Sequence, residues 1–215
     1  DGLVVISNGL KNELIKQGVA ANKILVARDA VDVEEYLHSE DSKNVWRAEF
    51  HIDPNKKVIL YAGHFYDWKG AATLAEAAKL LPEFEVYLIG GTDKDVYSFN
   101  HQYPFENLHV PGWYSHNLVS AWLCAADVLV IPTSGKFKIG SNYNSPMKLF
   151  EYMMARRPIV ASDLPSIREV LDDSSAVFFI ADNPTSLAET VRMVINNYDK
   201  AKIKADKAYI IASEK

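Results

Sequence analysis

The amino-acid sequence predicts an α/β fold in which a doubly wound, mainly parallel sheet carries helices on both faces. Three observations lead to this prediction. Short runs rich in Val, Ile and Leu recur along the 215 residues and end in small or turn-forming residues. Most of these runs are continuously apolar, which is typical of strands that are covered on both faces. Helical patterns separate many of them, and strands that alternate with helices favour a parallel sheet.

The expected strands are distributed along most of the chain. The first begins almost at the start of the sequence, which lacks an initiator methionine, so we expect a fragment of a longer protein. The expected strands are residues 3–7, 23–27, 57–63, 85–91, 108–112, 127–132, 158–162 and 176–180.

Helix start and stop signals lie between several of these strands. One helix is rich in Ala and Leu and ends at Pro82, another opens on the capping residue Ser115, and a third opens on Asn183 and Pro184. The polar stretch 31–57 is interpreted as surface helices. The three capped helices are expected at residues 70–81, 115–126 and 183–198.

One domain is expected, because the sequence contains no internal repeat and no low-complexity linker. Residues 1–56 are interpreted as lead-in strands and helices, residues 57–182 as the main sheet with the site, and residues 183–215 as C-terminal helices. In such a sheet, ligands bind beyond the carboxyl ends of the strands. The loops to search are therefore "AGHFYDWKG", "GGTD", "PGWYS", "PTSGKFKIGSNYNSPMK" and "SDLPSIRE".

Composition excludes several classes of protein. The net charge is −5 and the 23 Lys and Arg residues are scattered, which argues against a nucleic-acid-binding surface. Cys124 is the only cysteine, so a disulfide framework is impossible and a reduced, intracellular setting is favoured. No apolar run approaches the ~20 residues of a membrane span. We expect a cytoplasmic protein, and peripheral contact with the inner face of a membrane stays open.

The helix expected after Pro146 has almost no polar face, so it must be buried. Lys148 lies in its first turn, where a cation opposes the helix dipole, and Glu151 lies three residues further on the same face. A phosphate at this end can bind both the free amides and Lys148, while Glu151 accepts two ribose hydroxyls. The alternative is that Lys148 reaches water and Glu151 pairs with Arg156 or another basic residue.

The loop "AGHFYDWKG" places Gly63, His64 and Lys69 at the end of an expected strand, with Gly70 opening the next helix. Gly63 permits close approach of the backbone, and the two basic side chains can meet phosphate. Taken alone, Lys69 can also be a solvated loop lysine and His64 an ordinary polar loop residue. The Walker pattern of a phosphate-binding loop is absent, which disfavours an ATPase of that class.

Other motifs are weaker or missing. Trp113 and Tyr114 follow a short strand and can hold a flat base, although core packing explains them equally well. The three-glycine dinucleotide fingerprint and the Gly-x-Ser-x-Gly elbow are absent, which counts against nicotinamide binding and against an esterase. No Cys/His cluster and no closely spaced acidic pair lies on a candidate loop, so no protein-bound metal is expected.

Taken in order, four segments are more specific than any single motif. They are "VVISNGLKNELIKQGVAANKILVARDAVDVEEY", "ILYAGHFYDWKGAATLAEAAKLL", "HVPGWYSHNLVSAWLCAADVLVIPT" and "SPMKLFEYMMARRPIVASDLPSIREVL". Together they resemble the C-terminal domain of family 4 retaining glycosyltransferases, which is one Rossmann-like half of a GT-B fold. The resemblance covers nearly the whole chain. It implies a domain that binds a sugar nucleotide, while a preceding acceptor domain is absent here.

The resemblance also implies roles for individual residues. Gly63 matches the glycine beside the donor phosphates, and Lys69 matches the lysine that neutralises the departing diphosphate. Glu151 matches the glutamate that binds the ribose hydroxyls, and Met147 and Lys148 fall where backbone amides meet the diphosphate. Lys69 and His64 are accordingly the expected catalytic residues. The base is expected around residues 112–114, and Tyr143 and Ser145 complete the expected donor-binding set.

Three positions depart from the family pattern. Tyr143 stands where the family has a glutamate near the donor sugar, eight residues before Glu151. His64 replaces the usual arginine, which weakens the fixed positive charge. Arg156 stands where the family usually ends this helix with glycine, which affects the expected capping geometry. We expect changed sugar contacts rather than a dead site.

The leading interpretation is the donor-binding half of a retaining glycosyltransferase that uses a nucleotide diphosphate sugar and no cofactor or metal. Glycan, lipid-linked and small-molecule acceptors are all open, through the missing domain. The alternatives are a catalytically decayed nucleotide-binding or scaffold domain and an unrelated doubly wound nucleotide-binding module. Because half a cleft cannot orient an acceptor, the isolated chain is expected to be largely inactive.

Overall fold

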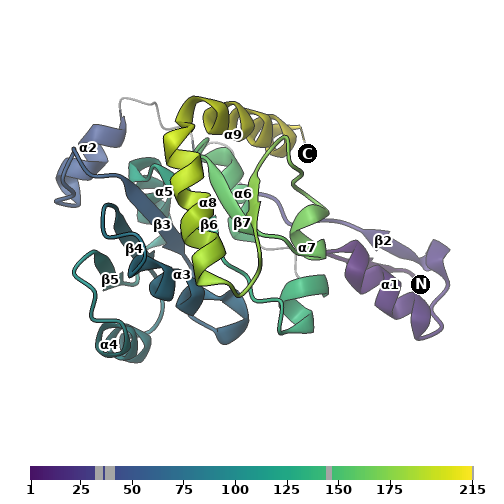
Figure 1. Cartoon of the computed structure of the whole chain (residues 1–215). Helices are drawn as coiled ribbons and strands as arrows, with labels where there is room; N and C mark the ends of the chain where they lie inside the picture. Colours follow the sequence, from purple (N-terminus) through teal and green to yellow (C-terminus); the bar gives the residue numbers. More distant parts are fainter. Residues whose placement is uncertain (32–35, 37–41, 144–146, 215) are drawn as a thin grey trace.

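A six-stranded parallel sheet forms the centre of the molecule (Figure 1). The computed structural model describes residues 1–31, 36, 42–143 and 147–214. The strand order is β5-β4-β3-β6-β7-β8, the order of a doubly wound sheet that reverses direction between β3 and β6. This confirms the predicted fold class. The strands are β3 (Val58–Ala62), β4 (Glu85–Ile89), β5 (Leu108–Gly112), β6 (Val128–Ile131), β7 (Ile159–Ser162) and β8 (Val177–Phe179).

Helices cover both faces of this sheet, because alternate strand side chains enter two separate cores. Leu60 and Leu129 belong to one core, and their neighbours Ile59 and Val130 belong to the other. The first core is covered by α2 (Ser42–Glu49), α5 (His116–Ala125), α6 (Met147–Met154), α7 (Pro165–Arg168) and α9 (Tyr198–Ser213). The second is covered by α3 (Ala71–Ala78), α4 (Asp93–Gln102) and α8 (Pro184–Asn196).

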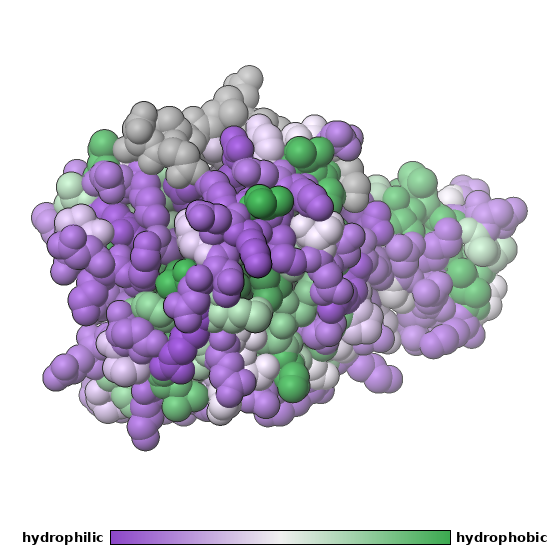
Figure 2. Space-filling view, turned by 45° about the horizontal axis from the view of Figure 1, so that its top comes forward, coloured by the Kyte–Doolittle hydropathy of each residue, from purple (hydrophilic) through white to green (hydrophobic). Residues whose placement is uncertain are grey.

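The first two strands form a separate small sheet. β1 (Leu3–Val5) pairs in parallel with β2 (Ile24–Val26), and α1 (Asn8–Lys16) connects them. This β1-α1-β2 unit projects from one end of the molecule (Figure 1). Apolar side chains gather on its surface (Figure 2), and Val4 and Leu25 are 69% and 64% exposed. Strand prediction was therefore correct here, but it did not reveal that these strands leave the main sheet.

Specific contacts hold the β1-α1-β2 unit against the main domain. The carboxylate of Glu169 accepts hydrogen bonds from the first two backbone N–H groups of α1, at 2.9 and 3.0 Å. The hydroxyl of Ser7, the N-cap of α1, donates to the carbonyl of Tyr143 at 2.9 Å. A Cβ atom on Gly9 would lie 1.7 Å from the carbonyl oxygen of Asn142. Only glycine fits this approach without a backbone shift.

Two further helical segments lie where loops were expected. The short π-helix Ile139–Tyr143 occupies part of the loop after β6. α4 follows the "GGTD" loop and begins with a capping box, in which Thr92 accepts from the N–H of Asp95 and the carboxylate of Asp95 accepts from the N–H of Thr92. α4 was not predicted because most of its residues are polar; only the short apolar face of Val96 and Phe99 packs against the second core. α3, α5 and α8 confirm the three predicted helices. Asn183 caps α8 through its side chain, whereas Ser115 takes the N-cap position of α5 but its hydroxyl donates to Asn117 instead of capping the helix.

A buried ionic network joins α2 to the sheet far from the carboxyl ends of its strands. Asp127 is 1% exposed and lies just before β6. Its carboxylate accepts hydrogen bonds from Arg47 and Lys43, both at 2.6 Å, and from the N–H of Val58 at 2.8 Å. Burial would raise the pKa of Asp127, but Lys43, the Val58 N–H and Arg47 hold it below its usual value.

Candidate functional site

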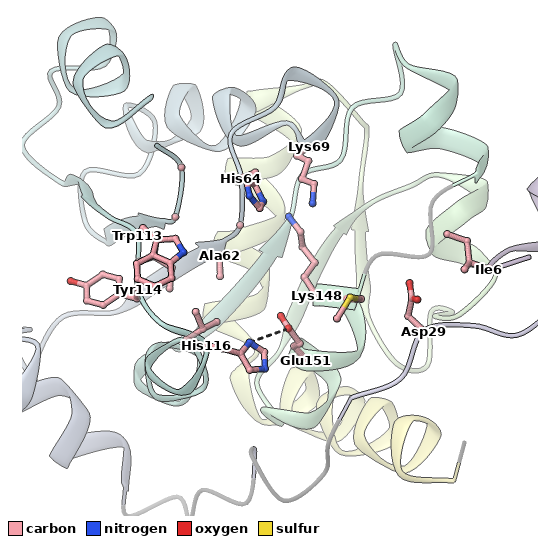
Figure 3. A pocket seen from close by; sticks show the side chains of 16 residues that line it. Ile6, Asp29, Ala62, His64, Lys69, Trp113, Tyr114, His116, Lys148 and Glu151 are labelled. Atoms are coloured by element: carbon pink, nitrogen blue, oxygen red, sulfur yellow. Dashed lines mark ion pairs between the residues drawn. The ribbon is translucent and has the colours of Figure 1, made fainter. Parts of the chain in front are cut away.

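A cavity of about 550 Å³ opens at the carboxyl ends of β3 and β4, beside the first turns of α5 and α6 (Figure 3). This is the side of the sheet on which doubly wound folds bind their ligands. Tyr143 is not among the lining residues, and Ser145 lies outside the described residues. The other predicted site residues are brought together here: Gly63, His64, Lys69, Trp113, Tyr114, Met147, Lys148 and Glu151.

Lys148 is the most deeply buried cation of the cavity. Only 9% of the residue is exposed, and its Nζ lies 4.0 Å from the ring centroid of Tyr61. It makes no hydrogen bond and no ion pair with any residue that the structure describes. Burial, and next the charge of Lys69, hold the pKa of Lys148 well below that of an ordinary lysine, against the opposing effect of Glu151. The nearby charge of Glu151 therefore acts on the ammonium group without forming a direct ion pair with it.

The packing of α6 explains why Lys148 is held in this position. Pro146 lies outside the described residues, and the helix begins at Met147. The N–H of Ala62, the last residue of β3, donates to the buried hydroxyl of Tyr152 at 2.7 Å. This bond fixes α6 against the end of β3, so the first-turn amides of α6 and Lys148 face the same space.

Glycine at position 63 keeps that space open. Gly63 has φ of 147°, and a Cβ atom there would lie 3.1 Å from Nζ of Lys148 and 3.2 Å from the hydroxyl oxygen of Tyr61. Gly90, at the end of the neighbouring strand, has φ of 110°, and a Cβ atom there would lie 2.2 Å from the carbonyl oxygen of Gly63. The two glycines let the strand ends approach and leave room beside Lys148 for a ligand.

Lys69 brings a second positive charge to the cavity. It ends the 3-10 turn Asp67–Lys69, and the left-handed Gly70, with φ of 73°, follows as the N-cap of α3. Burial lowers the pKa of Lys69, and Glu151 opposes this effect. Figure 3 shows the Lys69 and Lys148 side chains pointing toward the same region. Two cations in one partly buried space favour an anionic ligand.

His64 lies at the rim of the cavity. It is exposed, and its ring stacks on Tyr66 with centroids 5.2 Å apart and an interplanar angle of 7°. The ring is therefore braced from one side and open to the cavity on the other. Its predicted catalytic role stays a prediction.

Glu151 also lines the cavity, one turn along α6 from Lys148. Burial raises the pKa of Glu151, while His116 and Lys148 oppose this effect. Nδ1 of His116 lies 4.0 Å from its Oε1 (Figure 3). The alternative pairing with Arg156 is not made, because Arg156 bonds Asp206 at 2.7 Å. Arg156 adopts the left-handed conformation, with φ of 52°, so it keeps the backbone geometry expected of the glycine it replaces.

The two aromatic residues after β5 differ in their surroundings. Trp113 is 74% exposed at one end of the cavity. Tyr114 packs against Phe50 and Trp122, with ring centroids 6.2 and 5.4 Å away. Core packing therefore accounts for much of Tyr114, whereas Trp113 offers a free ring face to a flat ligand.

Tyr143 does not reach the cavity, contrary to the expectation that it belongs to the donor-binding set. Its hydroxyl donates to the carboxylate of Glu13 at 3.3 Å, on the helix of the β1-α1-β2 unit. The residue thus joins the two parts of the chain instead of contacting the ligand space. The physical reason is the π-helix Ile139–Tyr143, which ends against α1.

Two of the titratable lining residues were not among the predicted site residues. His116 is the first residue of α5, and Asp29 follows β2 and comes from the β1-α1-β2 unit. The position of His116 at a helix start beyond β5 was a usable signal. No signal in the sequence pointed to Asp29, because only the folded structure shows that the β1-α1-β2 unit reaches the cavity.

The residues that the structure describes contain no group of three or more His, Cys, Asp or Glu that could hold a metal ion. No helix within the same residues has both the length and the apolar character needed to cross a membrane.

The chain was compared with known protein families. The family described as Glycosyl transferases group 1 matches residues 56–197. The chain belongs to this family. The matched region of this group 1 glycosyltransferase sequence contains the whole six-stranded sheet together with Lys69, Lys148 and Glu151.

Curated relatives of the group 1 chain include two lipid glucosyltransferases. The processive diacylglycerol beta-glucosyltransferase of Staphylococcus saprophyticus is 24% identical over 198 residues, which cover 87% of this chain and 46% of the relative. The processive diacylglycerol alpha-glucosyltransferase of Acholeplasma laidlawii is 18% identical over 151 residues, which cover 68% of this chain and 43% of the relative. The aligned part is thus less than half the length of each relative.

Solved structures show the same fold. HepE from Anabaena, crystallised with UDP and glucose, has a TM-score of 0.83 at 18% identity, over 99% of this chain and 58% of that one. Sucrose-phosphate synthase from Thermosynechococcus elongatus has a TM-score of 0.83 at 17% identity, over 98% of this chain and 53% of that one. The group 1 chain has the Rossmann-like fold of one half of a GT-B glycosyltransferase.

Proposed function

We propose that this chain is the donor-binding half of a retaining glycosyltransferase, which transfers a sugar from a nucleotide diphosphate sugar to an acceptor in glycan or polysaccharide synthesis. The observation that carries the proposal is the ammonium group of Lys148. It is buried without a hydrogen bond or ion pair to the described residues, next to the space that Gly63 leaves open and close to Lys69. A diphosphate supplies the missing negative charge.

The diphosphate position then determines where the ribose and the base of the nucleotide bind. With the diphosphate at Lys148 and Lys69, the ribose hydroxyls reach Glu151 and the base stacks on the open face of Trp113. HepE was crystallised with UDP and with UDP-glucose, so uridine nucleotides are the first ligands to test.

The proposed catalytic role of this site is to stabilise the leaving group, which is the nucleoside diphosphate. As the bond between the anomeric carbon and the diphosphate oxygen breaks, negative charge grows on the diphosphate. Lys69, Lys148 and the first-turn amides of α6 are oriented toward that charge before the reaction begins, which is how a preorganised site lowers a barrier. We propose that these groups replace a metal ion, so that EDTA leaves transfer by the full-length protein unchanged.

The acceptor is proposed to bind to a second domain that faces the cavity. The exposed apolar side chains of β1 and β2 are suited to pack against such a domain. Both curated relatives are named for diacylglycerol, which makes a lipid acceptor one class to test, beside glycan and small-molecule acceptors. We propose a cytoplasmic location, because the only cysteine is free and buried.

A catalytically decayed nucleotide-binding or scaffold domain is the second candidate. The turning of Tyr143 away from the cavity favours it, because the family's glutamate has no replacement at that position. Labelled nucleotide sugars offered to the full-length protein separate the two candidates. Transfer supports the enzyme, whereas binding without turnover across donors and acceptors supports the decayed domain.

The stereochemistry of transfer needs its own measurement, since the two curated relatives are named for opposite anomers. We expect the full-length protein to convert an α-linked donor into an α-linked product. Proton NMR of the product reads the anomeric configuration directly. A β-linked product would contradict the retaining mechanism and leave the donor site intact.

Calorimetric titration of the chain with UDP and 2′-deoxy-UDP tests the donor site. We expect the wild-type chain to bind UDP about 10-fold more tightly than the deoxy nucleotide, because a hydrogen bond to a charged carboxylate is lost. Glu151→Gln should remove most of this preference, while Glu189→Gln on the exposed side of α8 should keep it. A folded wild-type chain that binds neither nucleotide would refute the proposal.

A further inference from the structure

The cavity has an order along its length (Figure 3). Trp113 and Tyr114 lie at one end, Glu151 and Lys148 lie in the middle, and Asp29 and Ile6 lie beyond Lys148 on the side away from the aromatic residues. If the nucleotide lies as proposed above, its base and ribose fill the aromatic half. Whatever is attached to the outer phosphate then extends toward Asp29.

A sugar at this end of the cavity needs a hydrogen-bond acceptor for its hydroxyl groups. Tyr143, the residue expected to contact the sugar, does not line the cavity. Tyr143 bonds Glu13 and Ser7 outside the cavity. Glu151, the only other carboxylate among the described lining residues, lies beside Lys148 in the middle of the cavity and is proposed above to bind the ribose. Asp29 is therefore the acidic group placed to meet the sugar.

The carboxylate of Asp29 is available for this task. It makes no hydrogen bond and no ion pair within the part of the chain that the structure describes, and it is half-buried. Its neighbour Arg28 is held by Glu169 at 3.7 Å. Ile6 provides an apolar wall beside it, suited to the C–H groups of a sugar ring.

We propose that Asp29 binds hydroxyl groups of the donor sugar, and that it makes the site selective for a neutral sugar over a uronic acid. This inference rests on the proposed function. A carboxylate accepts hydrogen bonds from neutral sugar hydroxyls, whereas it repels the carboxylate of a uronate. Asp29 thus takes over, from a different part of the chain, the contact that Tyr143 cannot make.

Calorimetric titration of the chain with UDP, UDP-glucose and UDP-glucuronate tests the inference. The wild-type chain should bind UDP-glucose about 3- to 10-fold more tightly than UDP-glucuronate. Asp29→Asn should bind UDP unchanged and lose most of this discrimination. The control Asp199→Asn removes the same charge from an exposed position on α9 and should behave as wild type.

The outcomes separate the two proposals. UDP binding with discrimination that Asp29→Asn abolishes supports the role of Asp29. UDP binding without discrimination in the wild type, or with discrimination that Asp29→Asn retains, overturns that role and leaves the donor site standing. A folded chain that does not bind UDP overturns the donor site, and the role of Asp29 with it.

Discussion

The Nζ atom of Lys148 lies over the aromatic ring of Tyr61, 4.0 Å from the ring centroid. The face of this ring takes the place of water around the ammonium group. A cation–π contact of this kind contributes about 2 kcal/mol when it is desolvated, whereas removing a charge from water costs several kcal/mol. The contact therefore offsets only part of the cost of burial. The ligand-free chain carries this cost at the centre of its site.

Replacing this cation should stabilise the ligand-free chain. We expect Lys148→Met to raise the free energy of unfolding by about 1 kcal/mol, because an apolar side chain of similar length fills the same space. The same change should weaken UDP binding by about 10-fold or more. Urea unfolding and calorimetric titration measure the two effects. Lys207→Met, at an exposed position of α9, is the control, and a less stable Lys148→Met would count against a buried, uncompensated cation.

Nucleotide affinity should depend on pH through the same group. Burial and Lys69 lower the pKa of Lys148 in the free chain, and a bound diphosphate raises it again. Affinity is then full below the free-chain pKa and falls as the pH rises from that value toward the bound-state pKa. Titrations with UDP from neutral to alkaline pH should show this fall.

Lys148→Arg provides the comparison for the pH series, because guanidinium stays charged throughout. Titration of the ligand affects both proteins equally, so the difference between their affinities isolates Lys148. Parallel curves for the two proteins would mean that Lys148 keeps its proton throughout, and the assigned direction of its pKa shift would be wrong.

The network around Asp127 should govern stability without affecting the site. Asp127→Asn leaves the charges of Arg47 and Lys43 without their partner, and we expect a loss of about 3 kcal/mol in the free energy of unfolding at neutral pH. UDP affinity should not change, because the network lies at the opposite ends of the strands. Urea unfolding with Asp199→Asn as control measures the loss.

The pH dependence of this loss has a definite sign. The pKa of Asp127 is lowered in the folded state, so its contribution is complete above the unfolded-state value of about 4 and disappears as the pH falls through the folded-state value. The stability difference between wild type and Asp127→Asn should therefore shrink in acid. A constant difference across this range would assign the loss to packing.

Sequence reasoning reached the fold because parallel strands buried on both faces leave continuous apolar runs, as in Ile59–Tyr61. The same apolar runs did not reveal the separate small sheet of β1 and β2, because an apolar run does not show which strand it pairs with. Glycine and lysine after an apolar strand located Gly63 and Lys69, and a cation in the first turn of an apolar helix located Lys148. Asp29 was beyond reach, because its place in the cavity depends on how α1 docks onto the main domain.

The docking of α1 gives the cavity two ends of different character. The half that holds Trp113, Lys148 and Glu151 is built from the main sheet and its helices, while Ile6 and Asp29 belong to a unit fastened by the hydrogen bonds at Glu169 and Tyr143. The geometry of the cavity at Ile6 and Asp29 therefore depends on how this unit docks, whereas the geometry at Lys148 and Glu151 depends on how α6 packs against the main sheet.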